Sequence, residues 1–131
     1  MEHGAPRVVL VVEDDSHSAR IAITALEHAG FRCRHATNAQ DALAALRQER
    51  PDLVVMDFNL PGLDGLQLTR WIKEDELTRE IPVLAVTAYA MEGDDQIARE
   101  TGCSGYIAKP YDPALLVGEA RRLTDATHPD P

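Results

Sequence analysis

Near its N-terminus the sequence reads Val8-Val9-Leu10-Val11-Val12-Glu13-Asp14, five aliphatic residues followed directly by two carboxylates. An unbroken aliphatic run of this length is typical of a strand that is buried on both faces, as in a parallel sheet. Later runs of the same kind lead to Asp57, Thr87 and Lys109. Because ligands bind outside the carboxyl ends of the strands in open parallel sheets, we expect these polar side chains to converge on one site.

Segments with apolar residues at helical spacing separate the apolar runs. Glycine or proline marks several of the helix ends, for example Gly30, Pro51 and Gly102. The predicted strands cover residues 8–12, 31–36, 53–56, 83–86 and 105–108, and the predicted helices cover residues 16–29, 38–49, 66–72, 92–101 and 113–123. This strict alternation predicts an α/β fold, a doubly wound sheet of five parallel strands flanked by five helices.

The composition narrows the class of protein. The chain has 131 residues, enough for one domain, and its net charge of −9 argues against nucleic-acid binding, which needs cationic neutralisation of phosphates. Cys33 and Cys103 form no disulfide or metal-binding pattern. The N-terminus does not have the pattern of a signal peptide, and no apolar run approaches the roughly 18 residues of a membrane span. We therefore expect a cytoplasmic protein without membrane insertion.

The strand-end residues suggest a particular chemistry. Glu13, Asp14 and Asp57 would provide carboxylate ligands for magnesium, and Lys109 would compensate part of their charge. The alternative is that these acids are solvated loop residues, the interpretation we prefer for Asp15. Thr87 also has two interpretations, since threonine is a common strand residue and its hydroxyl could equally donate to a phosphoryl oxygen. The Lys109-Pro110 bond is open to either peptide isomer.

Together these residues resemble the receiver domain of two-component response regulators. The resemblance spans about residues 7–123 and rests on four motifs in order: Val-Val-Glu-Asp-Asp at 11–15, Met-Asp-Phe-Asn-Leu-Pro-Gly-Leu-Asp-Gly at 56–65, Val-Thr-Ala at 86–88 and Lys-Pro at 109–110. It implies a flavodoxin-like sheet in the strand order 2-1-3-4-5. We expect a flexible N-terminus at 1–6, a receiver domain at 7–124 and a flexible tail at 125–131.

The resemblance also implies roles for individual positions. Asp57 matches the phosphoacceptor, and Mg²⁺ or Mn²⁺ is held by Glu13, Asp14, Asp57 and the backbone carbonyl of Asn59. The positions that contact the phosphoryl group or respond to it are Thr87, Ala88, Lys109 and Tyr106, of which Tyr106 matches an aromatic residue that turns inward. Asn59 and Tyr89 flank the path of the hydrolytic water, and the bulk of Tyr89 would slow hydrolysis.

The implied partners are proteins. A sensor histidine kinase or a histidine phosphotransfer protein would donate the phosphoryl group, and a downstream protein would bind the face formed by the fourth helix, fifth strand and fifth helix. Residues 87–94 are similar to the same loop in cell-division single-domain regulators and in receivers attached to hybrid histidine kinases. Both a free-standing regulator and a receiver within a longer kinase fit this sequence.

The function that the resemblance implies is a phosphoacceptor signalling switch, which is not an enzyme beyond catalysing its own phosphorylation and dephosphorylation. Three other functions compete with it. A magnesium-dependent phosphatase with an aspartyl nucleophile usually carries a second Asp two residues later, but position 59 is Asn. An interaction module that never takes phosphate would leave Asp57, Thr87 and Lys109 without a role. A flavodoxin-like cofactor binder would need a phosphate-binding loop after the first strand, where this chain has Glu13 and Asp14.

Overall fold

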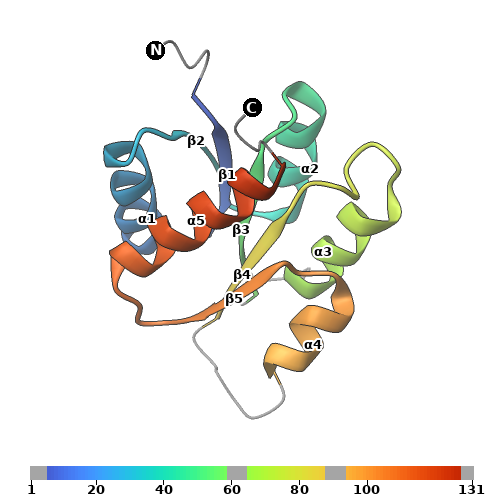
Figure 1. The fold of residues 1–131 in the computed structure, drawn as a ribbon. Helices are drawn as coiled ribbons and strands as arrows, with labels where there is room; N and C mark the ends of the chain where they lie inside the picture. Colours follow the sequence, from blue (N-terminus) through green and yellow to red (C-terminus); the bar gives the residue numbers. More distant parts are fainter. Residues whose placement is uncertain (1–5, 59–64, 88–93, 128–131) are drawn as a thin grey trace.

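The computed structural model describes residues 6–58, 65–87 and 94–127. In these residues five parallel strands form one sheet in the order β2-β1-β3-β4-β5, and a helix follows each strand (Figure 1). The elements are β1 (Val8–Val12), α1 (Ser16–His28), β2 (Arg32–Ala36), α2 (Ala39–Gln48), β3 (Leu53–Asp57), α3 (Gly65–Glu74), β4 (Val83–Thr87), α4 (Asp94–Thr101), β5 (Gly105–Ala108) and α5 (Pro113–Thr127). The predicted fold class and strand order are confirmed.

The sheet is covered on both faces, with α1 and α5 on one face and α2, α3 and α4 on the other (Figure 1). Side chains of β1 alternate between the two cores: Val9 and Val11 pack with α1 and α5, while Leu10 and Val12 pack on the opposite side. All five residues of β1 are buried. This two-sided burial explains why the strand is an unbroken aliphatic run rather than an alternating one.

Local signals position the helix ends. The side chain of Asn38 accepts a hydrogen bond of 2.8 Å from the Asp41 amide and caps α2 as predicted. Gly30 (φ 99°) and Gly102 (φ 112°) follow α1 and α4 in the left-handed conformation that glycine tolerates best. Helix α5 ends at Thr127, three residues beyond residue 124, which we predicted to be the end of the receiver domain. The limits of the domain stay a prediction.

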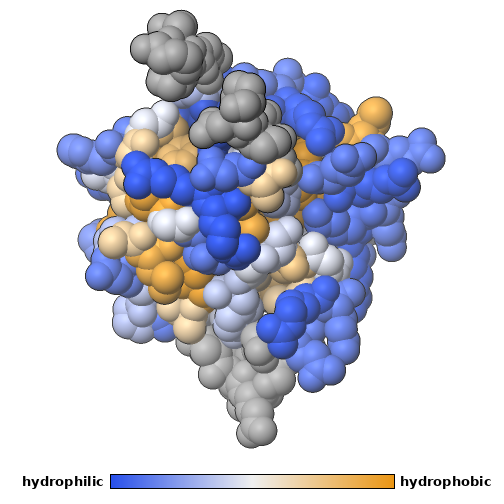
Figure 2. Space-filling model, viewed as in Figure 1, coloured by the Kyte–Doolittle hydropathy of each residue, from blue (hydrophilic) through white to orange (hydrophobic). Residues whose placement is uncertain are grey.

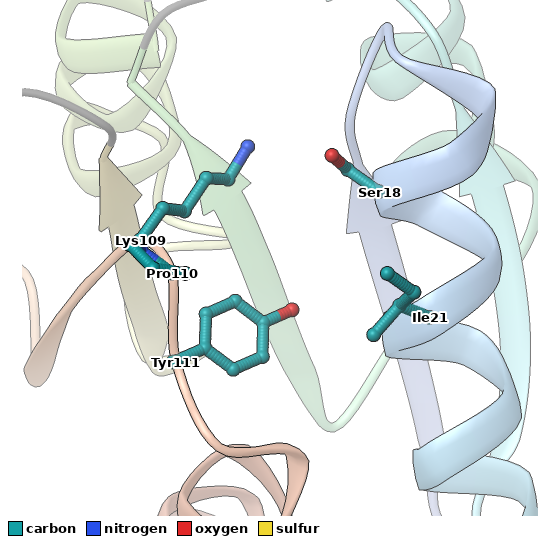
Figure 3. Close-up of a pocket in the computed structure, with 5 residues that line it drawn as sticks. All are labelled: Ser18, Ile21, Lys109, Pro110 and Tyr111. Atoms are coloured by element: carbon teal, nitrogen blue, oxygen red, sulfur yellow. The ribbon is translucent and has the colours of Figure 1, made fainter.

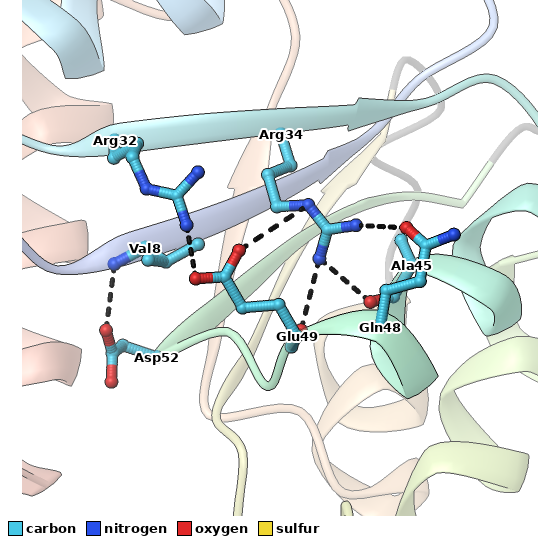
Figure 4. Close-up of polar contacts among 7 residues, drawn as sticks. All are labelled: Val8, Arg32, Arg34, Ala45, Gln48, Glu49 and Asp52. Atoms are coloured by element: carbon cyan, nitrogen blue, oxygen red, sulfur yellow. Dashed lines mark hydrogen bonds and ion pairs between the residues drawn. The ribbon is translucent and has the colours of Figure 1, made fainter.

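The edge strand β2 is held against α2 by two arginines (Figure 4). The guanidinium group of Arg34 donates to the carbonyl of Ala45 (2.8 Å), the carbonyl of Glu49 (3.1 Å) and the side-chain oxygen of Gln48 (2.9 Å). Arg32 forms an ion pair with the Glu49 carboxylate. These contacts fix the outer strand of the sheet to the C-terminal end of its own helix.

The surface carries hydrophobic residues over α1 and α5 (Figure 2), the helices to which the exposed Ile21 and Leu115 belong. None of the helices in the described part of the chain combines the length and hydropathy that spanning a membrane requires.

The last helix is joined to the first strand by Arg7, which directly precedes β1. Arg7 contacts the hydroxyl of Thr124 (2.9 Å) and the carboxylate of Asp125.

Candidate phosphoryl and metal site

Three carboxylates meet at the carboxyl ends of the two central strands. Asp57 is the last residue of β3, and Glu13 and Asp14 directly follow β1, which pairs with β3. One ligand oxygen from each of the three side chains lies within 4.8 Å of the others, and no second cluster of this kind occurs among residues 6–58, 65–87 and 94–127. The structure thus brings together the carboxylates that the strand-end pattern predicted would converge.

The cluster is unevenly exposed. Asp57 is 3% exposed and Glu13 is 6% exposed, whereas Asp14 is open to solvent. Behind Asp57, helix α3 begins so close that a Cβ atom on Gly65 would lie 2.3 Å from the Asp57 backbone carbonyl oxygen. Glycine at this position therefore allows α3 to pack directly against the end of β3.

Lys109 reaches this cluster from the end of β5. Its Nζ donates a hydrogen bond of 2.6 Å to Oε1 of Glu13 and lies 3.8 Å from Oδ2 of Asp57. The Lys109 amide donates to the carbonyl of Thr87 (2.7 Å), which joins this segment to the end of β4. The Lys109-Pro110 peptide bond is cis, one of the two isomers left open by the sequence.

Burial and charge act on these groups in opposite directions. Burial raises the pKa of Glu13, and the nearby Asp57 carboxylate raises it further, while the hydrogen bond from Lys109 lowers it; the net pKa is raised. Burial disfavours the charged form of Lys109, but its hydrogen bond to Glu13 and the charge of Asp57 outweigh burial, so the pKa of Lys109 is raised. The ammonium group is therefore held in its charged form beside two carboxylates.

Of the other predicted site residues, two lie within the described part of the chain and three lie outside it. Thr87, the last residue of β4, is buried next to this end of the sheet, and Tyr106 on β5 packs against the core on the α2, α3 and α4 side with its hydroxyl oxygen buried. Asn59, Ala88 and Tyr89 lie outside the described residues, as do residues 88–93 of the loop that resembles the cell-division regulators. The roles of both groups remain predictions.

Two residues at this site were missed by the sequence analysis. Asp15 is exposed, as expected of a solvated acid, but it is also the N-cap of α1: its side chain accepts from the Ser18 amide (2.8 Å), and its own amide donates to Oε2 of Glu13 (3.1 Å). An acidic residue directly before a helix was the available signal. The second is His35 on β2, whose Nε2 lies 2.8 Å from the carbonyl oxygen of Glu13.

A pocket of about 450 Å³ opens beside Lys109, between α1 and the segment that leads into α5. In Figure 3 the Lys109 ammonium and the Tyr111 hydroxyl both point toward α1, where Ser18 and Ile21 form the opposite wall. Lys109 thus belongs both to the wall of this pocket and to the carboxylate cluster. The pocket therefore adjoins the cluster through Lys109.

Comparison with known proteins gives consistent results. A sequence model described as the response regulator receiver domain matches residues 9–121. The polar-differentiation response regulator DivK of Brucella anthropi is 42% identical over 105 residues, which cover 80% of this chain and 85% of that protein. A putative response regulator from Chloroflexus aurantiacus superposes with a TM-score of 0.87 at 31% identity, covering 91% of this chain and 98% of the other.

A third similar structure is the signal receiver domain of a signal transduction histidine kinase from Syntrophus aciditrophicus. It has a TM-score of 0.86 and 30% identity, and the match covers 95% of each chain. The relatives of this chain therefore include proteins described as response regulators and a receiver domain described as part of a kinase.

Proposed function

Because this chain belongs to the response regulator receiver domain family, we propose that it is a signalling switch in which Asp57 accepts a phosphoryl group from a phosphohistidine. Receiver domains of this family take phosphoryl groups from histidine kinases and act on downstream targets. The observation that carries the assignment to Asp57 is its position: it is a carboxylate at a strand end, beside a lysine and two further carboxylates.

Magnesium fits this donor set. Receiver domains bind Mg²⁺ at an acidic pocket, and hard divalent cations prefer oxygen ligands of the kind that Glu13, Asp14 and Asp57 provide. We assign these three side chains and the backbone carbonyl of Asn59 as the residues that would hold Mg²⁺ or Mn²⁺. When bound, the ion would neutralise negative charge on the transferring phosphoryl oxygens.

The transfer itself needs little more than positioning. An Asp57 carboxylate oxygen forms a bond to phosphorus, the bond between phosphorus and the donor imidazole nitrogen breaks, and that nitrogen keeps the electron pair and takes up a proton. Lys109, 3.8 Å from Asp57, is placed to stabilise an equatorial phosphoryl oxygen.

The response to phosphorylation follows from the residues around Asp57. A new dianion at Asp57 would attract the Thr87 hydroxyl from the adjacent strand and the backbone of Ala88, and Tyr106 would repack behind Thr87. Such a response is a shift between two packings of one fold. We propose that the altered face of α4, β5 and α5 binds a downstream protein, and that Asn59 and Tyr89 set the rate at which water removes the phosphoryl group.

The first experiment is phosphorylation with acetyl phosphate or phosphoramidate, followed by intact-mass measurement with and without Mg²⁺. We expect the mass to increase by one phosphoryl group only when Mg²⁺ is present, and we expect Asp57→Asn to show no increase. The matched control is Asp15→Asn, which makes the same chemical change on the neighbouring loop and retains a side chain able to cap α1. This control should be phosphorylated like the wild type.

Two outcomes would contradict the proposal. Failure to take up phosphate despite measurable Mg²⁺ binding would favour an interaction module that is never phosphorylated. Steady release of phosphate over many turnovers would instead favour the phosphatase alternative, which the asparagine at position 59 argues against.

A further inference from the structure

The main chain at the acidic pair is held by a side chain from another strand. Nε2 of His35 lies 2.8 Å from the backbone carbonyl oxygen of Glu13. A carbonyl oxygen can only accept a hydrogen bond, so Nε2 must carry the proton and donate. This carbonyl belongs to the peptide group that links Glu13 to Asp14, the two carboxylates that follow β1.

The register of the sheet explains why a side chain is needed there. Strand β1 pairs with β2 from Val8 and Arg32 to Val12 and Ala36, and the Glu13 amide extends the ladder by donating to the carbonyl of Ala36 (3.0 Å). In a parallel ladder the Glu13 carbonyl would next accept from the backbone amide of residue 38. That residue is instead the N-cap of α2, and the imidazole of His35 supplies the donor.

The strand that carries His35 is held in place by contacts with α2. His35 lies on the edge strand β2, which the Arg32 and Arg34 contacts hold to the end of α2 (Figure 4). On the other side, the Glu13 side chain accepts hydrogen bonds from the Asp15 amide (3.1 Å) and from Lys109 (2.6 Å). The Glu13 backbone is therefore fastened by β2, and its carboxylate by the α1 cap and by Lys109.

We propose that His35 is a positioning residue for the magnesium site: its imidazole fixes the Glu13–Asp14 peptide group so that both carboxylates face Asp57. The inference rests on the proposed function, because it assumes that the three carboxylates bind the ion. His35 lies outside the four receiver motifs. It acts through the backbone carbonyl of Glu13 and does not itself contact the metal or the phosphoryl group. Partners of this kind raise metal affinity by reducing the reorganisation that binding requires.

The test compares His35→Ala, His35→Gln and His35→Asn by calorimetric titration with Mg²⁺. The amide nitrogen of glutamine can reach the position of Nε2, whereas that of asparagine falls near Nδ1 and is too short to reach the Glu13 carbonyl. We expect His35→Ala and His35→Asn to weaken Mg²⁺ binding about three- to tenfold, the size of one lost orienting hydrogen bond. His35→Gln should bind nearly as tightly as the wild type.

A second readout uses the metal-free protein. The amide nitrogen and proton of Asp14 belong to the same peptide group as the Glu13 carbonyl, so their NMR shifts should move in His35→Ala and His35→Asn and return toward the wild type in His35→Gln. The imidazole nitrogens of His35 should show Nε2 protonated. His28→Ala, which removes an exposed histidine at the far end of α1, is the control and should change neither readout.

The outcomes separate the two proposals. The role of His35 would be overturned if the wild type and all three variants bound Mg²⁺ with equal affinity. It would also be overturned if the Gln, Asn and Ala variants all lost the same amount of Mg²⁺ affinity. A wild type that binds no Mg²⁺ would overturn the metal site itself, while the Asp14 shifts and the imidazole protonation would still test the hydrogen bond.

Discussion

Glu13 has a hydrogen-bond partner on each of its polar atoms. Its amide donates to Ala36, its carbonyl accepts from His35, and its two carboxylate oxygens accept from Asp15 and Lys109. Despite these partners burial dominates, and the pKa of Glu13 is raised above its usual value of 4.5. Folding therefore makes the charged form of Glu13 less favourable than it is in the unfolded chain.

This raised pKa predicts a pH dependence of stability. In the unfolded chain Glu13 loses its proton near pH 4.5, whereas in the folded protein it keeps the proton to higher pH. In that interval the folded state binds more protons than the unfolded state, so the contribution of Glu13 to the free energy of unfolding falls as pH rises. We expect Glu13→Gln to remove this decline.

The measurement is urea unfolding between pH 4 and pH 7 with a chelator present. The difference between wild type and Glu13→Gln isolates this contribution from the other carboxylates, which are common to both. Glu74→Gln, on an exposed position of α3, is the matched control and should run parallel to the wild type. Parallel curves for wild type and Glu13→Gln would show that the Glu13 pKa is not raised by folding.

At the scale of single residues, the sequence predicted the positions that a strand pattern defines. Asp57 and Lys109 could be placed because each follows an apolar run that must be buried. His35 could not, because its contact with Glu13 depends on the register of an edge strand and on where that ladder stops. The spacing of residues along the chain reveals neither the register of β2 against β1 nor the residue at which their pairing ends.

At the scale of the elements, α3 begins so close to β3 that there is no room for a side chain at Gly65. A methyl group at Gly65 would stand 2.3 Å from the Asp57 carbonyl oxygen, so Gly65→Ala requires α3 to move away from the strand that carries Asp57. We expect a loss of stability of about 1–3 kcal/mol, typical of overpacking against a backbone that cannot yield. Urea unfolding measures it.

The matched control is Gly118→Ala in the middle of α5. There a Cβ atom would meet nothing within 4 Å, and the position is exposed. Alanine in a helix is favoured over glycine by roughly 0.5–1 kcal/mol, so this variant should gain stability. Unchanged or increased stability in Gly65→Ala would contradict the prediction, because it would mean that α3 and β3 accommodate the methyl group without cost.

Element boundaries were less predictable than element types. Caps with a side-chain mechanism, such as Asn38 before α2, could be read directly. The end of α5 could not, because Asp125 and Thr127 are polar and Asp125 is held by a contact that crosses the fold. Arg7, at the start of β1, binds Thr124 and Asp125, a pairing between the two ends of the chain that no local pattern indicates.

At the scale of the whole molecule, the site concentrates negative charge in a chain that already carries a net charge of −9. Glu13, Asp14 and Asp57 lie together, and Lys109 compensates only part of their charge. Repulsion among carboxylates stabilises the unfolded chain relative to the fold, in which they are held close. Folding and metal binding are therefore expected to be linked.

A ligand that binds only the folded protein stabilises it by RT ln(1 + [L]/Kd), or about 2.7 kcal/mol at a hundredfold excess over Kd. For a domain of this size such a gain raises the melting temperature by on the order of 10 °C. We expect Mg²⁺ to produce this shift in the wild type and a much smaller one in Asp57→Asn. Without metal, Asp57→Asn should melt at a higher temperature than the wild type, because one of the repelling charges is gone.

Screening has to be separated from binding, since salt alone reduces repulsion in an acidic protein. Sodium chloride at the same ionic strength is the control, and thermal unfolding followed by circular dichroism is the measurement. Screening would raise the melting temperature equally with either salt, whereas a site built from these carboxylates requires the Mg²⁺ effect to saturate and to depend on Asp57. Equal shifts of the melting temperature with both salts would contradict a metal site. They would mean that salt acts on the cluster only by screening the repulsion among its carboxylates.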